Sequence, residues 1–310
     1  MKYVQYVNAA FKAAAEKVQP FVFFGQNIAA GSCLGGLSRG LGTSPGHRGL
    51  NTPNVENTLV GAGFGLMLGG VSSAFFMKQQ DFLLLGLDQI VNTYNAVRQH
   101  APGASFSIVA TVVDSGFEGI QSSLNNLADF CSFGRVPGYT IACRQDADSI
   151  IGTVFARPGF RIIGVSQRLF GTEIIDFGAE PMLDRDSELF QYTKGADLTV
   201  ACCNLSLPQG KGLCDELAGQ GLSASLFGVN AATPVDYAPI LDDAKRTGRL
   251  LVLDDSKSAN IAAQDLRASA LEAGAKVRLV KREHSEDWYK PGAEIFGVDA
   301  GEILAGFGLK

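Results

Sequence analysis

The chain has 310 residues, which is long for one domain and comfortable for two. Hydrophobic residues make up 46% of it, enough to bury a sizeable core, so a disordered chain is excluded. The formal net charge of −5 does not provide the basic surface that nucleic-acid binding needs, and we expect no nucleic-acid partner.

The cysteines and histidines show no metal-binding pattern. Six cysteines are present without a Cys-x-x-Cys pair, and the three histidines are scattered at His47, His100 and His284. This spacing does not predict a zinc site, and we expect no metal ligands on this chain. Reduced, mostly buried thiols are typical of a cytoplasmic protein, which is the location we expect.

Residues 57–77 are the one stretch that invites a membrane assignment, because they carry no charge over a length that could span a bilayer. Their glycines lower the hydrophobicity, and the pair Gly69-Gly70 predicts a break between a short helix and a strand. We therefore expect no membrane span. Charges from Lys12 to Lys17 interrupt the first apolar stretch, so no signal peptide is expected.

Helical and extended patterns alternate along the chain and predict an α/β fold of two doubly wound domains. Apolar periodicity predicts a first helix from Val4 to Val18, ended by Pro20, and then the buried strand Phe21–Phe24. A glycine-rich loop follows over residues 31–49. In chain order, the further predictions are helix 56–68, a strand from 71, helix 84–98, strand 107–113, helix 124–133, strand 139–143, helix 147–156, strand 161–165, strand 197–203, helix 210–220, strand 223–229, helix 237–247, strand 249–255, helix 259–273 and strand 276–280.

The alternation fades in the middle of the chain, where acidic and basic residues crowd together. We interpret residues 176–194 as a linker between the two domains. The first domain is then expected over residues 1–175 and the second over residues 195–310.

A block from Leu50 to Asn92 carries the pattern that points to chemistry. Glu56 is predicted at the start of a helix, shortly after Thr52 and Pro53, where the helix N-terminus stabilises a carboxylate. Phe82 stands 26 positions further on. Taken alone, Glu56 would be an ordinary acid of a first helical turn and Phe82 a core residue. Their spacing, together with the motifs around them, favours a functional role.

In this order the motifs resemble the β subunit of the thiamine-diphosphate-dependent decarboxylase component of 2-oxoacid dehydrogenases, such as pyruvate dehydrogenase. More broadly, they resemble the C-terminal half of transketolase-like enzymes. Residues 52–65 are similar to the family pattern TPxxExxxxGxxxG, and residues 88–92 read DQIVN. Residues 127–141 and 245–255 resemble later family segments in the expected order. The resemblance spans the chain and implies a pyrimidine-binding domain followed by a transketolase C-terminal-like domain.

The resemblance also implies roles for individual residues. Glu56 would bind a ring nitrogen of the cofactor's aminopyrimidine, so that thiamine diphosphate can deprotonate its own reactive carbon. Phe82 would stack on the aminopyrimidine, and Val55 and Lys78 would belong to the same cofactor-binding site. The implied reaction is decarboxylation of a 2-oxoacid or cleavage of a ketose, with transfer of the acyl or two-carbon unit.

The family's diphosphate-binding motif is missing. The chain contains no GDG sequence, and the loop at residues 31–49 lacks the spacing of a phosphate loop. The resemblance then implies that an α-like subunit holds Mg²⁺ and the diphosphate, in an α₂β₂ heterotetramer. Gly61, Gly65 and Gly69 lie on one face of the predicted helix, which makes that face a candidate interface.

A family histidine on the substrate side is also missing. Residues 119–126 read GIQSSLNN, and none of these side chains titrates near neutral pH as histidine does. The residues that could stand in its place are Gln121, Ser122 and Asn125. His47, in the loop before Glu56, is an alternative proton carrier, or else a solvated loop histidine.

Two hypotheses of different classes follow. The first is the β-like subunit of a two-chain thiamine-diphosphate enzyme, favoured by Glu56 and Phe82 at the family spacing. The second is a degenerate subunit that scaffolds or regulates a related enzyme, favoured by the missing histidine. A dinucleotide site is not expected, because no GxGxxG follows the strand at residues 21–24.

Overall fold

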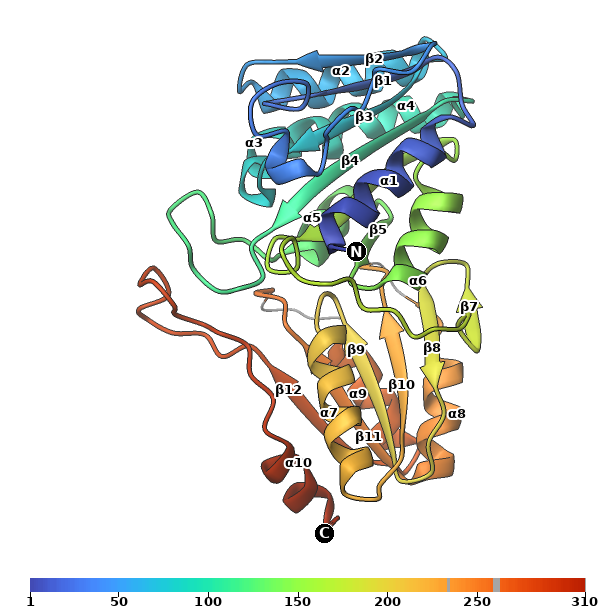
Figure 1. Ribbon diagram of the computed structural model, residues 1–310, viewed down its shortest axis with the longest axis vertical. Coiled ribbons are helices and arrows are strands. Elements are labelled where there is room, and N and C mark those ends of the chain that lie inside the picture. Colours follow the sequence, from blue (N-terminus) through green and yellow to red (C-terminus); the bar gives the residue numbers. More distant parts are fainter. Residues whose placement is uncertain (233–234, 259–262, 310) are drawn as a thin grey trace.

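The computed structural model describes residues 1–232, 235–258 and 263–309, and they form two α/β units stacked along the long axis of the molecule (Figure 1). The first unit is built on a six-stranded parallel sheet in the order β2-β1-β3-β4-β6-β5. Its strands are β1 (Phe21–Gly25), β2 (His47–Asn51), β3 (Ser72–Met77), β4 (Ser105–Val112), β5 (Gly138–Ile141) and β6 (Gly159–Ser166).

Helices cover both faces of this sheet, because its strands are apolar on both sides. In β3, Ala74 and Phe76 pack in one hydrophobic cluster and Phe75 and Met77 in another. The main helices are α1 (Tyr3–Ala15), α2 (Glu56–Leu68), α3 (Leu83–Asp88), α4 (Tyr94–Val97), α5 (Leu127–Gly134) and α6 (Arg144–Asp146). Short helical segments are Leu34–Gly36, Gln80–Phe82, Gln89–Thr93, Arg98–His100 and Ala147–Val154.

The second unit has a mixed sheet in the order β12-β11-β9-β10-β8-β7, in which β8 is antiparallel to both β10 and β7. Its strands are β7 (Leu183–Arg185), β8 (Leu189–Thr193), β9 (Leu198–Cys203), β10 (Ala224–Val229), β11 (Arg249–Asp254) and β12 (Lys276–Lys281). Its helices are α7 (Leu207–Gly219), α8 (Ala238–Thr247), α9 (Ala263–Glu272) and α10 (Ala300–Phe307). The expectation of two α/β units is confirmed. Residues 259–262 of the helix predicted at 259–273 lie outside the described residues.

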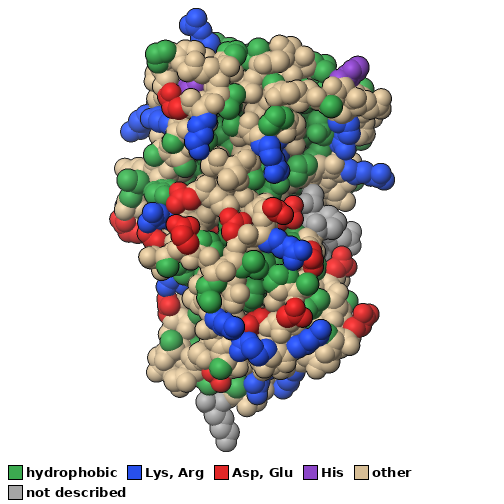
Figure 2. Space-filling model, turned by 90° about the vertical axis from the view of Figure 1, so that its right-hand side faces the viewer, with side chains coloured by type: hydrophobic (Ala, Val, Ile, Leu, Met, Phe, Trp, Pro, Cys, Tyr) green, Lys and Arg blue, Asp and Glu red, His purple; other side chains and the backbone are tan. Residues whose placement is uncertain are grey.

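The joining segment differs from the expected linker. Residues 176–194 contain β7 and β8, which pair with the second sheet and therefore belong to its structure. Acidic side chains gather at mid-height on the side of the molecule where β7 lies (Figure 2). This segment contributes exposed Asp176, Glu180, Asp184 and Asp186. Their solvation explains the loss of apolar patterning that suggested a linker.

The uncharged stretch at residues 57–77 forms α2 and β3, with the break at Gly69 and Gly70. None of the helices within the described ranges has both the length and the apolar character needed to cross a bilayer. The carboxyl end of β4 in the first sheet and those of β9 and β10 in the second point toward the region between the two units (Figure 1). Contacts there join Asn125 after β4 and Thr140 within β5 to residues that follow β9, β10 and β11.

Candidate functional site

Glu56 is the first residue of α2, at the carboxyl end of the β1–β2 pair. Thr52 continues the parallel ladder by donating its N–H to Gly25 O at 3.1 Å, so the turn into the helix is fixed. The Glu56 side chain is only 7% exposed. Among the described residues, none donates a hydrogen bond to its carboxylate. Its carboxylate oxygens are not among the fully buried side-chain atoms, so they keep access to solvent at a pocket and are available to a group from outside the chain.

A small pocket beside Glu56 collects three of the predicted residues. It is lined by Glu56, Lys78 and Phe82, with Pro53, Leu59 and the end of β3 completing its wall. Its volume is about 10 Å³, room for roughly one water molecule. Val55, predicted with them, does not line the pocket; it precedes α2 and is 42% exposed.

A larger groove adjoins this pocket and was not predicted. It has a volume of about 250 Å³ and shares Lys78 with the Glu56 pocket. Among the described residues, Lys78 forms no ion pair and no hydrogen bond, and its side chain is exposed. The rest of the groove is polar or apolar but uncharged: Asn27, Ser32, Leu34, Gly35, Gln79, Thr111, Gln167 and Phe170. The carboxyl ends of apolar strands were the sequence signal that could have located it.

Phe82 belongs to a short helical turn that also holds the loop between β4 and α5, residues 113–126, which we call the substrate-side loop. The Asp81 carboxylate accepts hydrogen bonds from Ser123 N at 3.0 Å and Leu124 N at 3.2 Å. The Gln80 side chain accepts one from Asn126 N at 2.7 Å. The residue facing the pocket and the residues fixing the loop are therefore consecutive in the chain.

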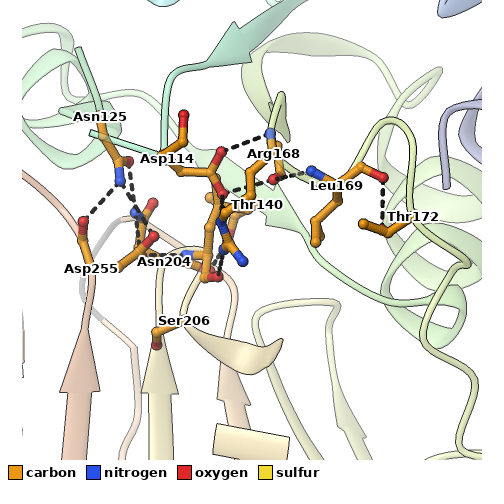
Figure 3. Close-up of polar contacts among 12 residues, drawn as sticks. Asp114, Asn125, Thr140, Arg168, Leu169, Thr172, Asn204, Ser206 and Asp255 are labelled. Atoms are coloured by element: carbon orange, nitrogen blue, oxygen red, sulfur yellow. Dashed lines mark hydrogen bonds and ion pairs between the residues drawn. The ribbon is translucent and has the colours of Figure 1, made fainter. Parts of the chain in front are cut away.

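The three residues that could stand in place of the family histidine lie in different surroundings. Gln121 is exposed, and Ser122 is half-buried and accepts a hydrogen bond from Gln79, a residue of the groove. Asn125 is fully buried and turns toward the second unit. Its Nδ2 donates to Asp255 O at 2.9 Å, and its Oδ1 accepts from Asn204 at 2.7 Å (Figure 3). Asn125 is thus a residue of the interface between the units.

His47 does not reach this site. It opens β2 and pairs in register with Phe21, the first residue of β1, whereas Glu56 follows the carboxyl end of the same strands. Its ring is buried against Phe21 and Phe23, so it is neither a solvated loop residue nor a neighbour of Glu56. His47 therefore lies at the other end of the sheet from Glu56, which argues against the interpretation of His47 as a substitute proton carrier in this pocket.

Buried charges mark the interface between the units. Asp114 accepts hydrogen bonds from Ser166 Oγ at 2.7 Å and Arg168 Nε at 3.1 Å (Figure 3). Asp255 accepts from Asn204 Nδ2 at 2.8 Å and faces Arg282 at 3.9 Å. Burial raises the pKa of Asp255 to about 7, and the nearby Asp114 charge adds to the increase while Arg282 opposes it.

Within the described ranges, no three His, Cys, Asp or Glu side chains come together as a metal site. The six cysteines are free thiols, four of them buried.

No protein-family model matches the chain. It is 25% identical to the β subunit of the acetoin:2,6-dichlorophenolindophenol oxidoreductase of Cupriavidus necator, over 91% of this chain and 88% of that one. It is 24% identical to a mitochondrial 2-oxoisovalerate dehydrogenase β subunit of Arabidopsis thaliana, over 79% and 70%. It is 22% identical to the 2-oxoisovalerate dehydrogenase β subunit of Bacillus subtilis, over 84% and 81%.

In fold, the chain matches a split-gene transketolase solved as an inactive β4 tetramer. The TM-score is 0.75 at 14% identity, over 98% of this chain and 95% of that one. The predicted resemblance is therefore confirmed: the chain is similar in sequence to β subunits of 2-oxoacid dehydrogenases and in fold to a split transketolase.

Proposed function

We propose that this chain is the β-like subunit of a two-chain thiamine-diphosphate enzyme that decarboxylates a 2-oxoacid or cleaves a ketose and transfers the acyl or two-carbon unit. The observation that carries the proposal is Glu56, a largely buried residue whose carboxylate accepts no hydrogen bond from the described residues and lies in one pocket with Phe82. The similarity to dehydrogenase β subunits supports it. When bound, thiamine diphosphate supplies a nucleophilic carbon that attacks a carbonyl group.

In this proposal the chain's own residues orient the cofactor. Glu56 would hold a proton between its carboxylate and a ring nitrogen of the aminopyrimidine. Phe82 would offer an aromatic surface for the ring. A pocket of about 10 Å³ is too small to enclose a pyrimidine, so these two residues would contact the ring without surrounding it.

The remaining half of the site is proposed to come from an α-like partner. This chain has no GDG motif, and the described residues offer no metal cluster, so Mg²⁺ and the diphosphate need other ligands. Apolar side chains close to the Glu56 pocket in the chain are exposed, as a subunit interface would require: Val55 at 42%, Leu84 at 58% and Leu85 at 59%. Leu68, at the other end of α2, is 50% exposed. We propose an α₂β₂ assembly. Six free thiols fit a cytoplasmic enzyme.

Lys78 favours a donor that carries a negative charge. It is the link between the Glu56 pocket and the adjoining groove, and its ammonium group is unpaired among the described residues. A 2-oxoacid placed in the groove would direct its carboxylate to Lys78 and its carbonyl carbon toward the Glu56 pocket. We therefore favour the 2-oxoacid over a neutral ketose as the donor.

The scaffold hypothesis is kept because of the substrate-side loop. Gln121 and Ser122 cannot shuttle a proton near neutral pH, and Asn125 is committed to the interface. A β-like chain that binds a partner without activating the cofactor would have the same loop.

Native mass spectrometry of the tagged chain from its own cells tests both hypotheses. The enzyme hypothesis predicts a second subunit together with Mg²⁺ and thiamine diphosphate. An isolated chain, or a complex without cofactor, would favour the scaffold.

Replacing Glu56 then tests the mechanism. We expect Glu56→Ala to lower turnover by about 10²- to 10⁴-fold, the range of a general acid or base, with the fold intact. The circular dichroism signal of the activated cofactor should disappear in the same variant. Glu302→Ala is the matched control, since Glu302 is an exposed acid in the first turn of α10. Full turnover by Glu56→Ala would rule out the assigned role.

A further inference from the structure

The substrate-side loop is held by the second unit through its backbone. Three of its carbonyl oxygens accept hydrogen bonds from there. Arg282 Nη2 donates to Asp114 O at 3.0 Å, and Lys257 donates from Nζ to Ser123 O at 2.6 Å and from its backbone N–H to Asn125 O at 2.8 Å. Because the bonds go to the backbone, they fix the path of the loop and leave Gln121 and Ser122 unconstrained by the second unit.

Arg282 joins three segments of the chain at one guanidinium group. It donates from Nε to Asp255 O at 2.8 Å and from Nη1 to Glu294 O, in addition to its bond with the loop. Its side chain is fully buried. Burying a guanidinium is costly unless it is paired and hydrogen-bonded, and here Asp255 and three carbonyl oxygens meet that need.

Asn125 completes the contact from the loop's side. Its Nδ2 lies 2.9 Å from Asp255 O and 3.4 Å from Asp255 Oδ2, and Asn204 bridges Asn125 and Asp255 from the end of β9 (Figure 3). Asn125, one of the three residues that could stand in place of the family histidine, therefore has a structural role through its side-chain amide.

The C-terminal part of the second unit also lies against the loop (Figure 1). The rings of Phe117 and Trp288 meet edge to face with centroids 5.9 Å apart. A Cβ atom at Gly116 would come within 2.7 Å of Ala293 O, so the two backbones approach closely there. The C-terminal part of the second unit therefore contacts the loop at Gly116 and Phe117, away in the chain from the residues that Asp81 binds.

We propose that the second unit positions the substrate-side loop, with Lys257 and Arg282 as positioning residues for the reaction. The proposal rests on the proposed function, which makes this loop part of the substrate site. The two units are also joined by hydrogen bonds that do not involve the loop. Asn230 Nδ2 donates to Thr140 O at 2.7 Å, and Thr140 N donates to Asn230 O at 2.9 Å. The bonds from Lys257 and Arg282 serve the loop itself.

Hydrogen exchange of the full-length chain tests this positioning. Lys257→Met removes the side-chain bond to Ser123 O, and we expect amide exchange over residues 118–126 to accelerate about tenfold, the scale of one charge-assisted hydrogen bond. Lys257→Arg should restore slow exchange, since a guanidinium can donate to the same oxygen. Asn230→Ala, which weakens the other contact between the units, should leave the exchange of the loop unchanged. Arg282 is less suitable because its removal takes the donor from three carbonyl oxygens and the cation from Asp255 at once. Lys257→Met removes one side-chain hydrogen bond and the pairing of Nζ with Glu294 at 4.0 Å, and Lys257→Arg restores a cation for both.

Kinetics connect the loop to the reaction. In the complex loaded with thiamine diphosphate, Lys257→Met should raise the donor KM several-fold, and Asn230→Ala should not. Unchanged exchange in Lys257→Met, or equal acceleration in Asn230→Ala, would overturn the positioning role. If the wild-type complex binds no thiamine diphosphate, the proposed function fails, while the exchange experiment still decides whether the second unit holds the loop.

Discussion

In the proposed function, the charge of the single side chain Lys78 would favour one class of donor over another. It lines both the Glu56 pocket and the adjoining groove, and the described residues include no anion paired with it. A donor carboxylate would gain a charged partner there, whereas a neutral hydroxyketone would gain nothing comparable.

The test of this role is a specificity ratio. Lys78→Gln keeps a polar side chain of similar length but removes the charge. We expect kcat/KM for pyruvate to fall about tenfold relative to kcat/KM for acetoin, because one charge-assisted hydrogen bond is lost. The ratio cancels any shared loss of cofactor binding. Equal losses for both donors would show that Lys78 does not select the donor by charge.

At the scale of elements, α2 carries two glycines with opposite surroundings. A Cβ atom at Gly63 would lie 2.2 Å from the Phe106 ring, which is fully buried, whereas at Gly65 it would meet nothing within 4 Å. Gly63 thus permits close packing of α2 on β4. Gly65 lies on the open face that we propose for the partner.

These two glycines make a matched pair for stability measurements. Gly63→Ala should destabilise the chain by about 1–3 kcal/mol through overpacking against Phe106. Gly65→Ala should be neutral or stabilise it by up to about 1 kcal/mol, because alanine loses less backbone entropy in a helix. Urea unfolding of the two variants checks the difference. The opposite order of stability would contradict the described packing.

Most elements were predictable because their residues are buried on a regular period. Phe21–Gly25 and Ser105–Val112 are apolar runs of two-sided buried strands, and the 3.6-residue period is clear in α1. β2 was missed because its sequence, HRGLN, is polar and mostly exposed at the edge of the sheet. β8 was missed because charged neighbours obscured its apolar residues.

The candidate site was predictable only in part, because sequence patterns report local spacing and not contacts between distant segments. Glu56, Lys78 and Phe82 meet because they follow the carboxyl ends of β2 and β3, the two strands on either side of β1, which a spacing pattern can indicate. The partner of Asn125 is Asp255, 130 positions away in the other unit. No local pattern identifies a contact at that separation, so Asn125 was grouped with the substrate-side candidates.

For the whole molecule, the buried cluster between the units predicts a pH dependence of stability. The pKa of Asp255 is about 7 in the folded chain, against an ordinary value of 3.8. Between these values the folded state keeps a proton that the unfolded state has lost. The stability contributed by this group is therefore complete below about pH 4 and is lost as the pH rises through about 7.

Asp255→Asn should remove the part of the pH dependence of stability that comes from Asp255. Between about pH 4 and pH 8, the unfolding free energy of the wild type should fall relative to that of the variant by more than roughly 1.4 kcal/mol, the value of one pKa unit. Asp197→Asn is the control, since hydrogen bonds from Ser223 lower the pKa of Asp197 and place its effect below about pH 4. Parallel curves for Asp255→Asn and the wild type would contradict the assignment.

The sequence Gln80-Asp81-Phe82 has a thermodynamic consequence. Phe82 lines the pocket, while Gln80 and Asp81 accept hydrogen bonds from the substrate-side loop within the same helical turn. If cofactor binding at Phe82 orders that turn, it also orders the loop, and linkage makes the effect reciprocal. A bound donor that settles the loop would then tighten the cofactor by the same factor by which the cofactor tightens the donor. Such an enzyme would release its cofactor most readily between turnovers, when the loop has no donor to hold.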